Sequence, residues 1–509
     1  MTHWLDRLTQ GIAPRWTAKR IRARIASELI KSHYEMAASG RRTQGWNRTS
    51  GDANAANSGV LSRGRDVARD LVRNNPYAES AVSTIVDHAV GWGIVAKPAK
   101  GATKAAQNLA ADRWDRWAGT TACDADGRLD FAGLEKLVVR TVVESGECLV
   151  RRRWRLPEDG LPIPMQLQVL EPDYLDSTRD STSPNGAVRQ IQGIIFDGIG
   201  RRVAYQLFRE HPGSSVPGLS GFGQSDRIPA EDVLHVFKQN RPGQIRGVSW
   251  FAPVALRLKE FDEYEDAALL KQKIAACLAV IITDADGSAT PLGLSTPDKP
   301  DVDEIFPGMI ANFPMGKTAT VVDPPTVSEH AEFAQTMLRA IAAGFGVTYE
   351  DLTGDYGNLP FSAARMSRLR HWARVEDWRW RMLIPQFCDP VWKWAMQAAV
   401  IDGMPADPPA AEWTAPPMPM MDPTAEATAL QNLMRIGALS WPEMQRERGY
   451  DPETVLAEIA EWNAKFDVAK VVFDMDPRRT SQQGQPAQQV APTAPMPEPS
   501  MNGNNGGRS

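Results

Sequence analysis

The sequence predicts an α+β protein, in which a helical block comes first, short strands follow, and long helices make up the rest. Between residues 62 and 145, apolar side chains recur at the three- and four-residue spacing of amphipathic helices. Residues 147–237 hold short β-branched or alternating runs that Pro, Gly and Asp turns separate. From residue 254 the helical spacing returns in longer segments. Residues 60–250 therefore predict one α+β unit, followed by a mostly helical half.

The first block predicts four helices. Residues 62–91 form two helices that meet at Pro76, since proline removes an amide donor and does not fit a helix interior. A third helix is expected at 109–119 and a fourth at 131–145, where Asp130 is a capping residue type. The strands are then expected at 147–154, 166–170, 188–196, 203–208 and 233–237.

Residues 254–279 predict one long helix with apolar side chains on two sides. At about 100° per residue, Leu258, Phe261 and Ala268 share one face. Roughly opposite this face lie Leu256, Leu270 and Ile274. A helix with apolar residues on two sides fits a ring or bundle better than a surface cap. The acidic residues between the two faces are Glu260, Asp262, Glu263 and Asp266.

The remaining elements follow in order. A strand is expected at 319–322, a helix at 329–346, a glycine-punctuated loop at 347–360 and a long helix at 362–401, with a kink at Pro385. Seven prolines between 405 and 423 indicate a linker, and 424–465 a small helical unit. From 476 onward, six prolines and many Gln, Asn, Gly and Ser predict a disordered tail.

The composition excludes several protein classes. The chain has 509 residues, 42% hydrophobic and 23% charged, so it is neither collagen-like nor wholly disordered. Its longest apolar run, 274–282, is far too short for a membrane span, and the N-terminus lacks a signal-peptide pattern, so we expect synthesis in the cytoplasm. The four cysteines form no C-x-x-C pair. A net charge of -5 does not attract nucleic acid, so any DNA contact is local or weak.

No catalytic or cofactor site is expected. Gly316-Lys317-Thr318 resembles the end of a P-loop, but Ala311 stands where the first glycine is required and Pro314 offers no amide. No histidine pair has metal-ligand spacing, so the seven histidines are interpreted as surface or packing residues. The carboxylate pairs Asp351 with Asp355 and Asp262 with Glu263 are interpreted as solvated charge, since no nucleophile accompanies them.

Two basic stretches contain tryptophan. Residues 151–155 read Arg-Arg-Arg-Trp-Arg, and on a strand these arginines divide between the two faces. A partner contact or an exposed edge is therefore at least as good an interpretation as phosphate binding. In the 362–401 helix, five tryptophans are expected to pack the core, with arginines snorkelling or pairing with Glu376 and Asp377, and this interpretation is preferred to nucleic-acid binding.

Four ordered blocks of sequence carry a resemblance to a known family. They are YEMAASGRRTQGW at 34–46, RDLVRNNPYA at 69–78, RPGQIRGVSW at 241–250 and IAAGFGVTYEDLTGDY at 341–356. Together they resemble the lambda-family portal proteins of tailed bacteriophages. The resemblance implies a portal-type fold: a basic, partly flexible arm (1–59), an α+β wing (60–250), a first stem helix (253–279), a clip (280–328), a second stem helix (329–346), a tunnel loop (347–361), a long helix (362–402), a Pro-rich linker (403–423), a helical crown (424–475) and a disordered tail (476–509).

The resemblance also implies a function. Such a chain forms a ring of usually twelve copies at one capsid vertex, through which double-stranded DNA is packaged and ejected without sequence-specific binding, and it catalyses nothing. The implied partners are the terminase large subunit, head-tail connector or adaptor proteins and the major capsid protein, and the implied location is the virion, after assembly in the bacterial cytoplasm. No cofactor, metal or membrane is implied.

Two sets of residues become candidates for contact with the passing DNA. In the stem, acidic side chains would repel the duplex toward the axis, which makes Glu260, Asp262, Glu263 and Asp266 candidates for the channel lining. In the tunnel loop, the DNA-facing candidates are Thr348, Tyr349, Asp351, Thr353, Asp355, Tyr356 and Asn358.

Two alternatives remain open on the residues alone. A packaging ATPase of the terminase type would need an intact P-loop, which Ala311 and Pro314 oppose. A monomeric DNA-binding protein would be expected to have a pI above about 9, whereas the pI of this chain is 5.9.

Overall fold

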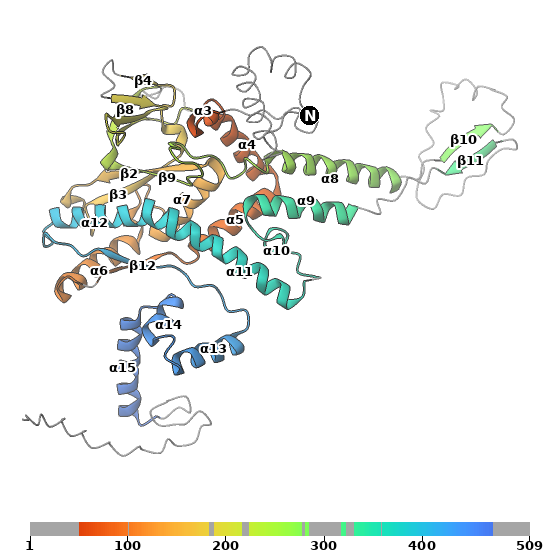
Figure 1. The fold of residues 1–509 in the computed structure, drawn as a ribbon. Helices are drawn as coiled ribbons and strands as arrows, with labels where there is room; N and C mark the ends of the chain where they lie inside the picture. The colour runs from red at the N-terminus through yellow and green to blue at the C-terminus, as the bar shows by residue number, and fades with distance from the viewer. Residues whose placement is uncertain are drawn as a thin grey trace, which may run out of the picture. The chain divides into compact units, whose positions relative to one another are not determined.

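The computed structural model describes residues 50–99, 101–182, 188–215, 223–276, 280–284, 317–321, 330–357 and 359–471 (Figure 1). The chain divides into two compact units, one of residues Met1–Ser58 with Asn240–Ile245 and the other of Gly59–Gln239 with Arg246–Ser509. In the smaller unit, α3 (Ala53–Asn57) begins at Asp52, whose side chain accepts a hydrogen bond from the amide of Ala55. Most of the predicted arm and the whole predicted tail, 476–509, lie outside the described residues.

The predicted helices of the first block are confirmed. α4 (Leu61–Asn74) and α5 (Pro76–Val90) meet at Asn75, whose side chain accepts from the amide of Ala78. α7 (Phe131–Ser145) begins after Asp130, whose carboxylate accepts from the amide of Gly133 at 2.8 Å. α6 (Lys104–Ala118) starts five residues earlier than expected because Thr103 caps it.

Two antiparallel sheets follow. The three-stranded sheet has the order β3 (Met165–Leu170), β2 (Glu147–Trp154), β9 (Val233–Phe237). The five-stranded sheet runs in sequence order: β4 (Ser181–Thr182), β5 (Val188–Ile191), β6 (Ile194–Asp197), β7 (Arg202–Phe208) and β8 (Ser225–Pro229). The expected strands of the first sheet and the strand at 203–208 are confirmed.

The prediction of a single strand at 188–196 is wrong. The chain turns at Gln192 and Gly193, with φ of 50° and 79°, so that Ile191 pairs with Ile194 across a two-residue hairpin. Positive φ at both turn residues matches the right-handed twist of the flanking strands. Glutamine is an unusual residue at such a position, so the sequence did not indicate this turn.

The predicted Pro-rich linker contains a strand. β12 (Ala411–Thr414) pairs in antiparallel register with β1 (Val95–Pro98), and neither strand was expected. Two indole groups hold the segment in place: Trp392 donates to the carbonyl of Pro409 at 2.9 Å, and Trp413 donates to the carboxylate of Asp389. The linker is therefore packed against the helices over part of its length.

In the segment implied to be stem and clip, the described residues form two helices and a pair of strands. α8 (Ala255–Ala276) and α9 (His330–Phe345) lie side by side and run in opposite directions (Figure 1). β10 (Val280–Asp284) pairs with β11 (Lys317–Val321) in antiparallel register. Both helices match their predicted ranges to within a few residues, while β10 was not expected because its apolar residues continue those of the preceding helix.

The predicted long helix is continuous but changes its hydrogen bonding at Pro385. α11 (Phe361–Trp378) passes into a π-helical segment (Arg379–Cys388) and then into α12 (Asp389–Ile401). At its end the amide of Asp389 bonds the carbonyl of Ile384, five residues back. The wider turns accommodate a residue that has no amide to donate, at the position where a kink was expected.

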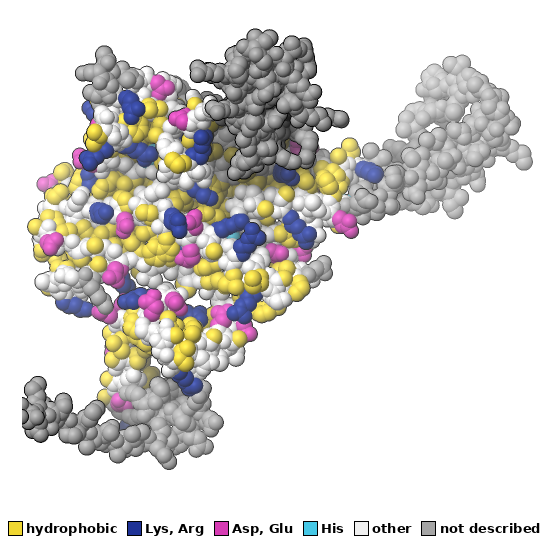
Figure 2. All heavy atoms as spheres, viewed as in Figure 1, with side chains coloured by type: hydrophobic (Ala, Val, Ile, Leu, Met, Phe, Trp, Pro, Cys, Tyr) yellow, Lys and Arg dark blue, Asp and Glu magenta, His cyan; other side chains and the backbone are white. Residues whose placement is uncertain are grey.

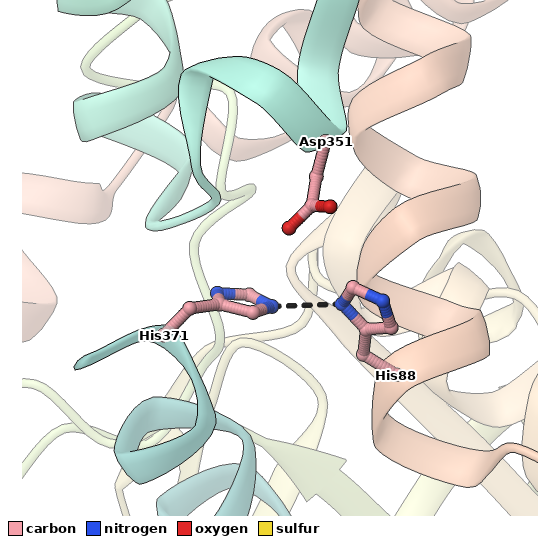
Figure 3. A group of neighbouring side chains, drawn as sticks. All are labelled: His88, Asp351 and His371. Carbon is pink, nitrogen blue, oxygen red and sulfur yellow. Dashed lines mark hydrogen bonds between the residues drawn. The ribbon is translucent and has the colours of Figure 1, made fainter. Parts of the chain in front are cut away.

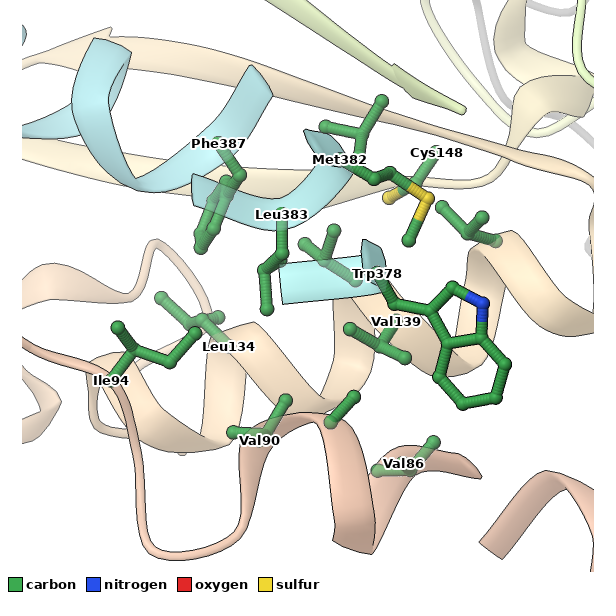
Figure 4. Close-up of a cluster of buried hydrophobic side chains, with 14 of the residues drawn as sticks. Val86, Val90, Ile94, Leu134, Val139, Cys148, Trp378, Met382, Leu383 and Phe387 are labelled. Carbon is green, nitrogen blue, oxygen red and sulfur yellow. The ribbon is translucent and has the colours of Figure 1, made fainter. Parts of the chain in front are cut away.

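The π-helical segment supplies the centre of the hydrophobic core. Met382, Leu383 and Phe387 pack with buried side chains of α5, α7 and β2 (Figure 4), among them Val90, Leu134 and Cys148. Of the five tryptophans expected in the core, three are buried, Trp372 is half-buried, and Trp380 is 49% exposed. The pairing of arginines with Glu376 and Asp377 is confirmed, by Arg379 and Arg381 respectively.

The region implied to be the crown is helical, as predicted. It contains α13 (Pro423–Arg435), α14 (Trp441–Glu447) and α15 (Pro452–Ala469). Each follows a capping side chain, supplied by Asp422, Ser440 and Asp451, and each has proline as its first or second residue. Across the described parts of the chain, no helix is long and apolar enough to span a membrane.

Candidate functional site

α9 packs closely against the residues that lead into α8. A Cβ atom on Gly344 of α9 would lie 2.1 Å from Cγ1 of Val254, so only glycine permits this packing. The ring of Phe251 stands edge-on to that of Phe345, with centroids 4.8 Å apart. Further along, the rings of Tyr264 and Phe333 lie 4.5 Å apart. Aromatic contacts therefore join the pair along its described length.

The two apolar faces predicted for α8 have different environments. On the first face, Leu258 and Phe261 are completely buried, with Phe261 packed against the ring of Tyr77 on α5. On the second face, Leu256 is 69% and Leu270 59% exposed. The side chain of Ile274, expected on this second face, lies outside the described residues. One apolar face thus serves the chain's own core, and the other is uncovered in the single chain.

All four acidic stem candidates are exposed. Glu260, Asp262, Glu263 and Asp266 reach solvent, and Glu263 contacts Lys259 at 3.5 Å. The sequence analysis did not single out Glu265, which is half-buried and lies 3.5 Å from the hydroxyl of Tyr77. Burial is the main cause that raises the pKa of Glu265, while the hydrogen bond from Tyr77 acts in the opposite direction. Glu265 lies toward α5, whereas the other four acidic side chains reach solvent. This difference follows from tertiary packing, which no local sequence pattern indicates.

The predicted tunnel loop contains a short helix, α10 (Tyr349–Thr353). The hydroxyl of Thr348 caps it by accepting from the amide of Asp351 at 3.0 Å, and Gly354 ends it in the left-handed conformation with φ of 71°. The loop is tied internally, because the Tyr349 hydroxyl donates to Asp355 and the Tyr356 hydroxyl donates to Asp351. The expected irregular loop is therefore ordered at its start.

α10 rests on α5. Ser80 donates to the carbonyl of Leu352 at 2.8 Å, Thr84 donates to that of Asp351, and the Leu352 side chain is buried. Among the loop candidates, Asp355 and Tyr356 are exposed. The half-buried candidates are Thr348, Tyr349, Asp351 and Thr353, and Asn358 lies outside the described residues.

Two histidines and an aspartate meet between α5, α10 and α11 (Figure 3). Nδ1 of His88 lies 2.8 Å from Nε2 of His371, and Nδ1 of His371 lies 3.1 Å from the carbonyl oxygen of Gly346. His371 donates to that carbonyl, so its Nε2 accepts the proton of His88. Burial is the main cause that lowers the pKa of both imidazoles. One ligand atom each of His88, Asp351 and His371 lies within 4.8 Å of the other two.

The sequence did not indicate this cluster. The two histidines are 283 residues apart and were interpreted as surface or packing residues, while Asp351 was paired with Asp355 as solvated charge. For Asp351 that interpretation is wrong, since its carboxylate is half-buried and points toward the two imidazoles (Figure 3).

A second acidic cluster is already neutralised by arginine. Glu171, Asp173 and His211 offer ligand atoms within 4.8 Å of one another. Asp173 accepts from Arg65 at 3.2 Å and from Arg69 at 2.6 Å, and Arg69 also contacts Glu171 at 3.1 Å. These contacts are ion pairs and leave no need for a cation there.

The structure bears on the two stretches that were considered for phosphate binding. The interpretation of 151–155 as an exposed edge strand is wrong, because β2 is the central strand of its sheet. Lys317 and Thr318 lie on β11, whereas a P-loop passes into a helix at this point. Within the stretch at 151–155, Arg152 is buried and donates to Asp232 at 2.7 Å, so it is not available to a phosphate. On the face shown in Figure 2, acidic and basic side chains are interspersed with hydrophobic ones.

Sequence comparisons identify relatives with a common description. The model of the family described as phage portal protein, lambda family, matches residues 39–379. The probable portal protein of Halomonas phage phiHAP-1 is 27% identical over 374 residues, which cover 69% of each chain. The portal protein of Escherichia phage N15 is 25% identical, covering 71% of this chain and 74% of the relative, and portal protein B of Escherichia phage lambda is 24% identical, covering 66% and 68%.

Solved structures give a weaker likeness. A chain from the neck of an empty gene transfer agent particle is 17% identical, with a TM-score of 0.45, covering 77% of this chain and 94% of that one. A chain from the native gene transfer agent virion has a TM-score of 0.44 at 16% identity, covering 76% and 94%. At these TM-scores the likeness supports no conclusion about function.

The match to the family model covers about two thirds of the sequence, including the whole of the α+β unit at 60–250, α8, α9 and the loop that carries α10. Three relatives with the same description support it over a similar share of their length. The chain therefore belongs to the lambda family of phage portal proteins.

Proposed function

We propose that twelve copies of this chain close into a ring whose channel is lined by α8 and by the loop that follows α9. As a member of the family, the chain is a phage portal protein, the DNA channel at the capsid vertex. It is a structural, non-catalytic component of the virion. The number of copies and the lining residues are our inference.

One observation carries the assembly part of this proposal: the uncovered apolar face of α8. A closed ring needs two different, complementary surfaces on each subunit, because its interfaces are heterologous. The exposed Leu256 and Leu270 supply one such surface, opposite the buried Leu258 and Phe261. Burying these side chains against the neighbouring subunit stabilises the ring through the hydrophobic effect.

The charge supports a channel that conducts DNA without gripping it. Twelve chains of net charge -5 give a ring of about -60, if charges add. Each strong phosphate contact would add affinity that the packaging motor must overcome. The exposed Glu260, Asp262, Glu263 and Asp266 on α8, and Asp355 and Tyr356 in the loop, are our candidates for the residues nearest the duplex.

The same role requires protein partners. We infer contacts with the terminase large subunit during packaging, with connector or adaptor proteins after it, and with the major capsid protein throughout. α13 and α15 support a protein-binding role for their region, because Leu433, Leu456 and Trp462 are exposed in the single chain.

Photo-crosslinking during packaging tests the channel lining. Benzoylphenylalanine is placed singly at Asp262, Asp266, Asp355 or Tyr356, with Ile199 as control, since Ile199 is 77% exposed in the turn between β6 and β7. Procapsids carrying each variant are irradiated while DNA is being packaged, and DNA joined to the portal chain is counted. We expect adducts from stem and loop positions and none from the control. Adducts from the control alone would contradict the assignment.

A further inference from the structure

We propose that His88, Asp351 and His371 form a binding site for a first-row divalent transition metal ion, with Zn²⁺ as the best match. Metal binding at this site requires neither passing DNA nor ring assembly. Two imidazoles and one carboxylate are a ligand set that Zn²⁺ takes in proteins, with the fourth position left to water.

The ligand atoms are close to the spacing that the ion requires. They lie within 4.8 Å of one another, and Figure 3 shows the three side chains directed toward a common space. Tetrahedral bonds of about 2.0 to 2.2 Å hold ligand atoms about 3.3 Å apart. The two histidine nitrogens, now 2.8 Å apart, must separate by about half an ångström. Small side-chain rotations achieve such a change without moving the helices.

Two of the ligands are already oriented by an outer contact. The carbonyl of Gly346 accepts from Nδ1 of His371, which leaves the lone pair of Nε2 directed at the site. A backbone carbonyl in this position is a common partner of metal-bound histidine, because it fixes the tautomer and the ring orientation. The Tyr356 hydroxyl donates to one oxygen of Asp351 and leaves the other oxygen for the ion.

The third ligand, His88, must change its tautomer. Without an ion, Nδ1 of His88 carries the proton that it donates to His371. When Nδ1 binds the ion, this proton leaves and Nε2 takes one up from water, so the imidazole stays neutral and no net proton is released. The carboxylate of Asp351 offsets one of the ion's two charges.

The positive charge of Arg368 lies near the proposed site and provides a test of its electrostatics. Arg368 lines the same pocket as Asp351 and Tyr356. Its positive charge acts on both histidines and opposes a bound cation. Removing this charge is therefore expected to strengthen metal binding, an effect opposite in sign to that of losing a ligand.

The position of the site gives the ion a mechanical consequence. Its ligands come from α5, α10 and α11, so the ion would tie the start of the tunnel loop to two helices of the body. A chelator is then expected to loosen α10 without unfolding the chain, because α10 keeps its hydrogen bonds from Ser80 and Thr84.

Calorimetric titration of the untagged full-length chain with Zn²⁺, after dialysis against EDTA, tests the proposal. We expect one ion per chain at this site, at least tenfold weaker binding in His88→Gln, His371→Gln and Asp351→Asn, and tighter binding in Arg368→Gln. His211→Gln is the matched control, since it changes a histidine of the arginine-neutralised cluster, and it should bind as the unmodified chain does. Co²⁺ absorption then reports the coordination geometry.

Two outcomes would overturn the proposal. One is a chain that takes up no Zn²⁺, which would leave His88 and His371 as a simple hydrogen-bonded pair. The other is binding that the three ligand variants do not weaken. Circular dichroism of each variant in EDTA separates loss of a ligand from loss of folding, and Asp351→Asn, which keeps the side-chain shape, decides the matter where a histidine variant does not fold. None of these measurements involves DNA or ring assembly.

Discussion

Arg246 donates to both carboxylate oxygens of Glu147 in the interior of the protein, with Nε at 2.9 and 3.0 Å from them. Glu147 also accepts from the amide of Gly247 and contacts Nε2 of His235. Burial by itself would raise the pKa of Glu147, but Arg246 and His235 outweigh it and hold the pKa well below its ordinary value. The pair connects the start of β2 with the RPGQIRGVSW block, and so gives that part of the family resemblance a structural reason.

Replacing Arg246 by methionine should strongly destabilise the chain. The substitution leaves Glu147 buried without its main partner, and losing one member of a buried ion pair costs about 3 to 5 kcal/mol. Urea denaturation measures the free energy of unfolding. Arg209→Met is the matched control, because Arg209 pairs with Asp226 on the surface. This variant should unfold as the unmodified chain does. Equal stability of the two variants would contradict the importance of the buried pair.

Gly344→Ala should weaken the packing of α9 against the start of α8. The added methyl group would meet Cγ1 of Val254 at 2.1 Å, and overpacking of this kind costs about 1 to 3 kcal/mol. Adding Val254→Ala should recover part of the loss by making room. Gly64→Ala is a control in an open part of α4, where alanine should stabilise the helix by about 0.5 to 1 kcal/mol. The prediction is wrong if thermal unfolding shows that Gly344→Ala and Gly64→Ala change the stability in the same direction.

Leu256→Lys combined with Leu270→Lys should impair ring formation and leave the single chain folded. Both side chains are exposed in the chain, so lysine adds no buried charge until a neighbouring subunit covers it. Native mass spectrometry and negative-stain microscopy report the fraction of closed rings. Ile199→Lys, an equally apolar change in the turn between β6 and β7, should assemble normally. Intact rings in the double variant would mean that this face of α8 is not a subunit interface.

Stability should fall as the pH rises from about 5 to about 8, and Glu135 is the cause. Its carboxyl is completely buried, accepts from the amide of Ile94 and contacts Cys388, and burial raises its pKa to about 8. The folded chain therefore binds a proton that the unfolded chain releases above its ordinary pKa of about 4.5. Folding loses this contribution progressively with increasing pH, by a few kcal/mol at most.

Glu135→Gln checks the assignment, because an amide has the same shape and does not ionise. The variant should show a flatter dependence of the thermal midpoint on pH between 5 and 9, measured with a reductant present to protect the buried thiols. It should also be more stable than the unmodified chain at pH 9. An unchanged pH dependence would show that Glu135 does not titrate in this window.

Local chemistry explains where prediction from the sequence succeeded. Asp130 and Asn75 accept amide hydrogen bonds at the starts of α7 and α5, which are short-range contacts that a capping pattern specifies. The hairpin at Gln192 and Gly193 was missed because its sequence is not that of a common turn. β1 and β12 were missed because each is four residues long and gains its backbone partners from the other, far along the chain.

The same distinction between local signals and contacts made in the folded chain applies to the candidate site. Exposure of the four acidic stem residues agrees with their place between the apolar faces, which helical periodicity determines. The meeting of His88, Asp351 and His371 had no local signal, because three separate helices bring these side chains together.

By itself, the sequence determined the long helices, the strands β2, β3, β7, β9 and β11, the two apolar faces of α8, the lack of an intact P-loop and the family blocks, because periodicity, caps and motifs act over a few residues. The tertiary structure alone decided which face of α8 is buried, that Arg246 pairs with Glu147, and that two distant histidines are hydrogen-bonded to each other. The physical reason is that burial and ion pairing depend on which surfaces meet in space, and a single helix or strand carries no information about its partner.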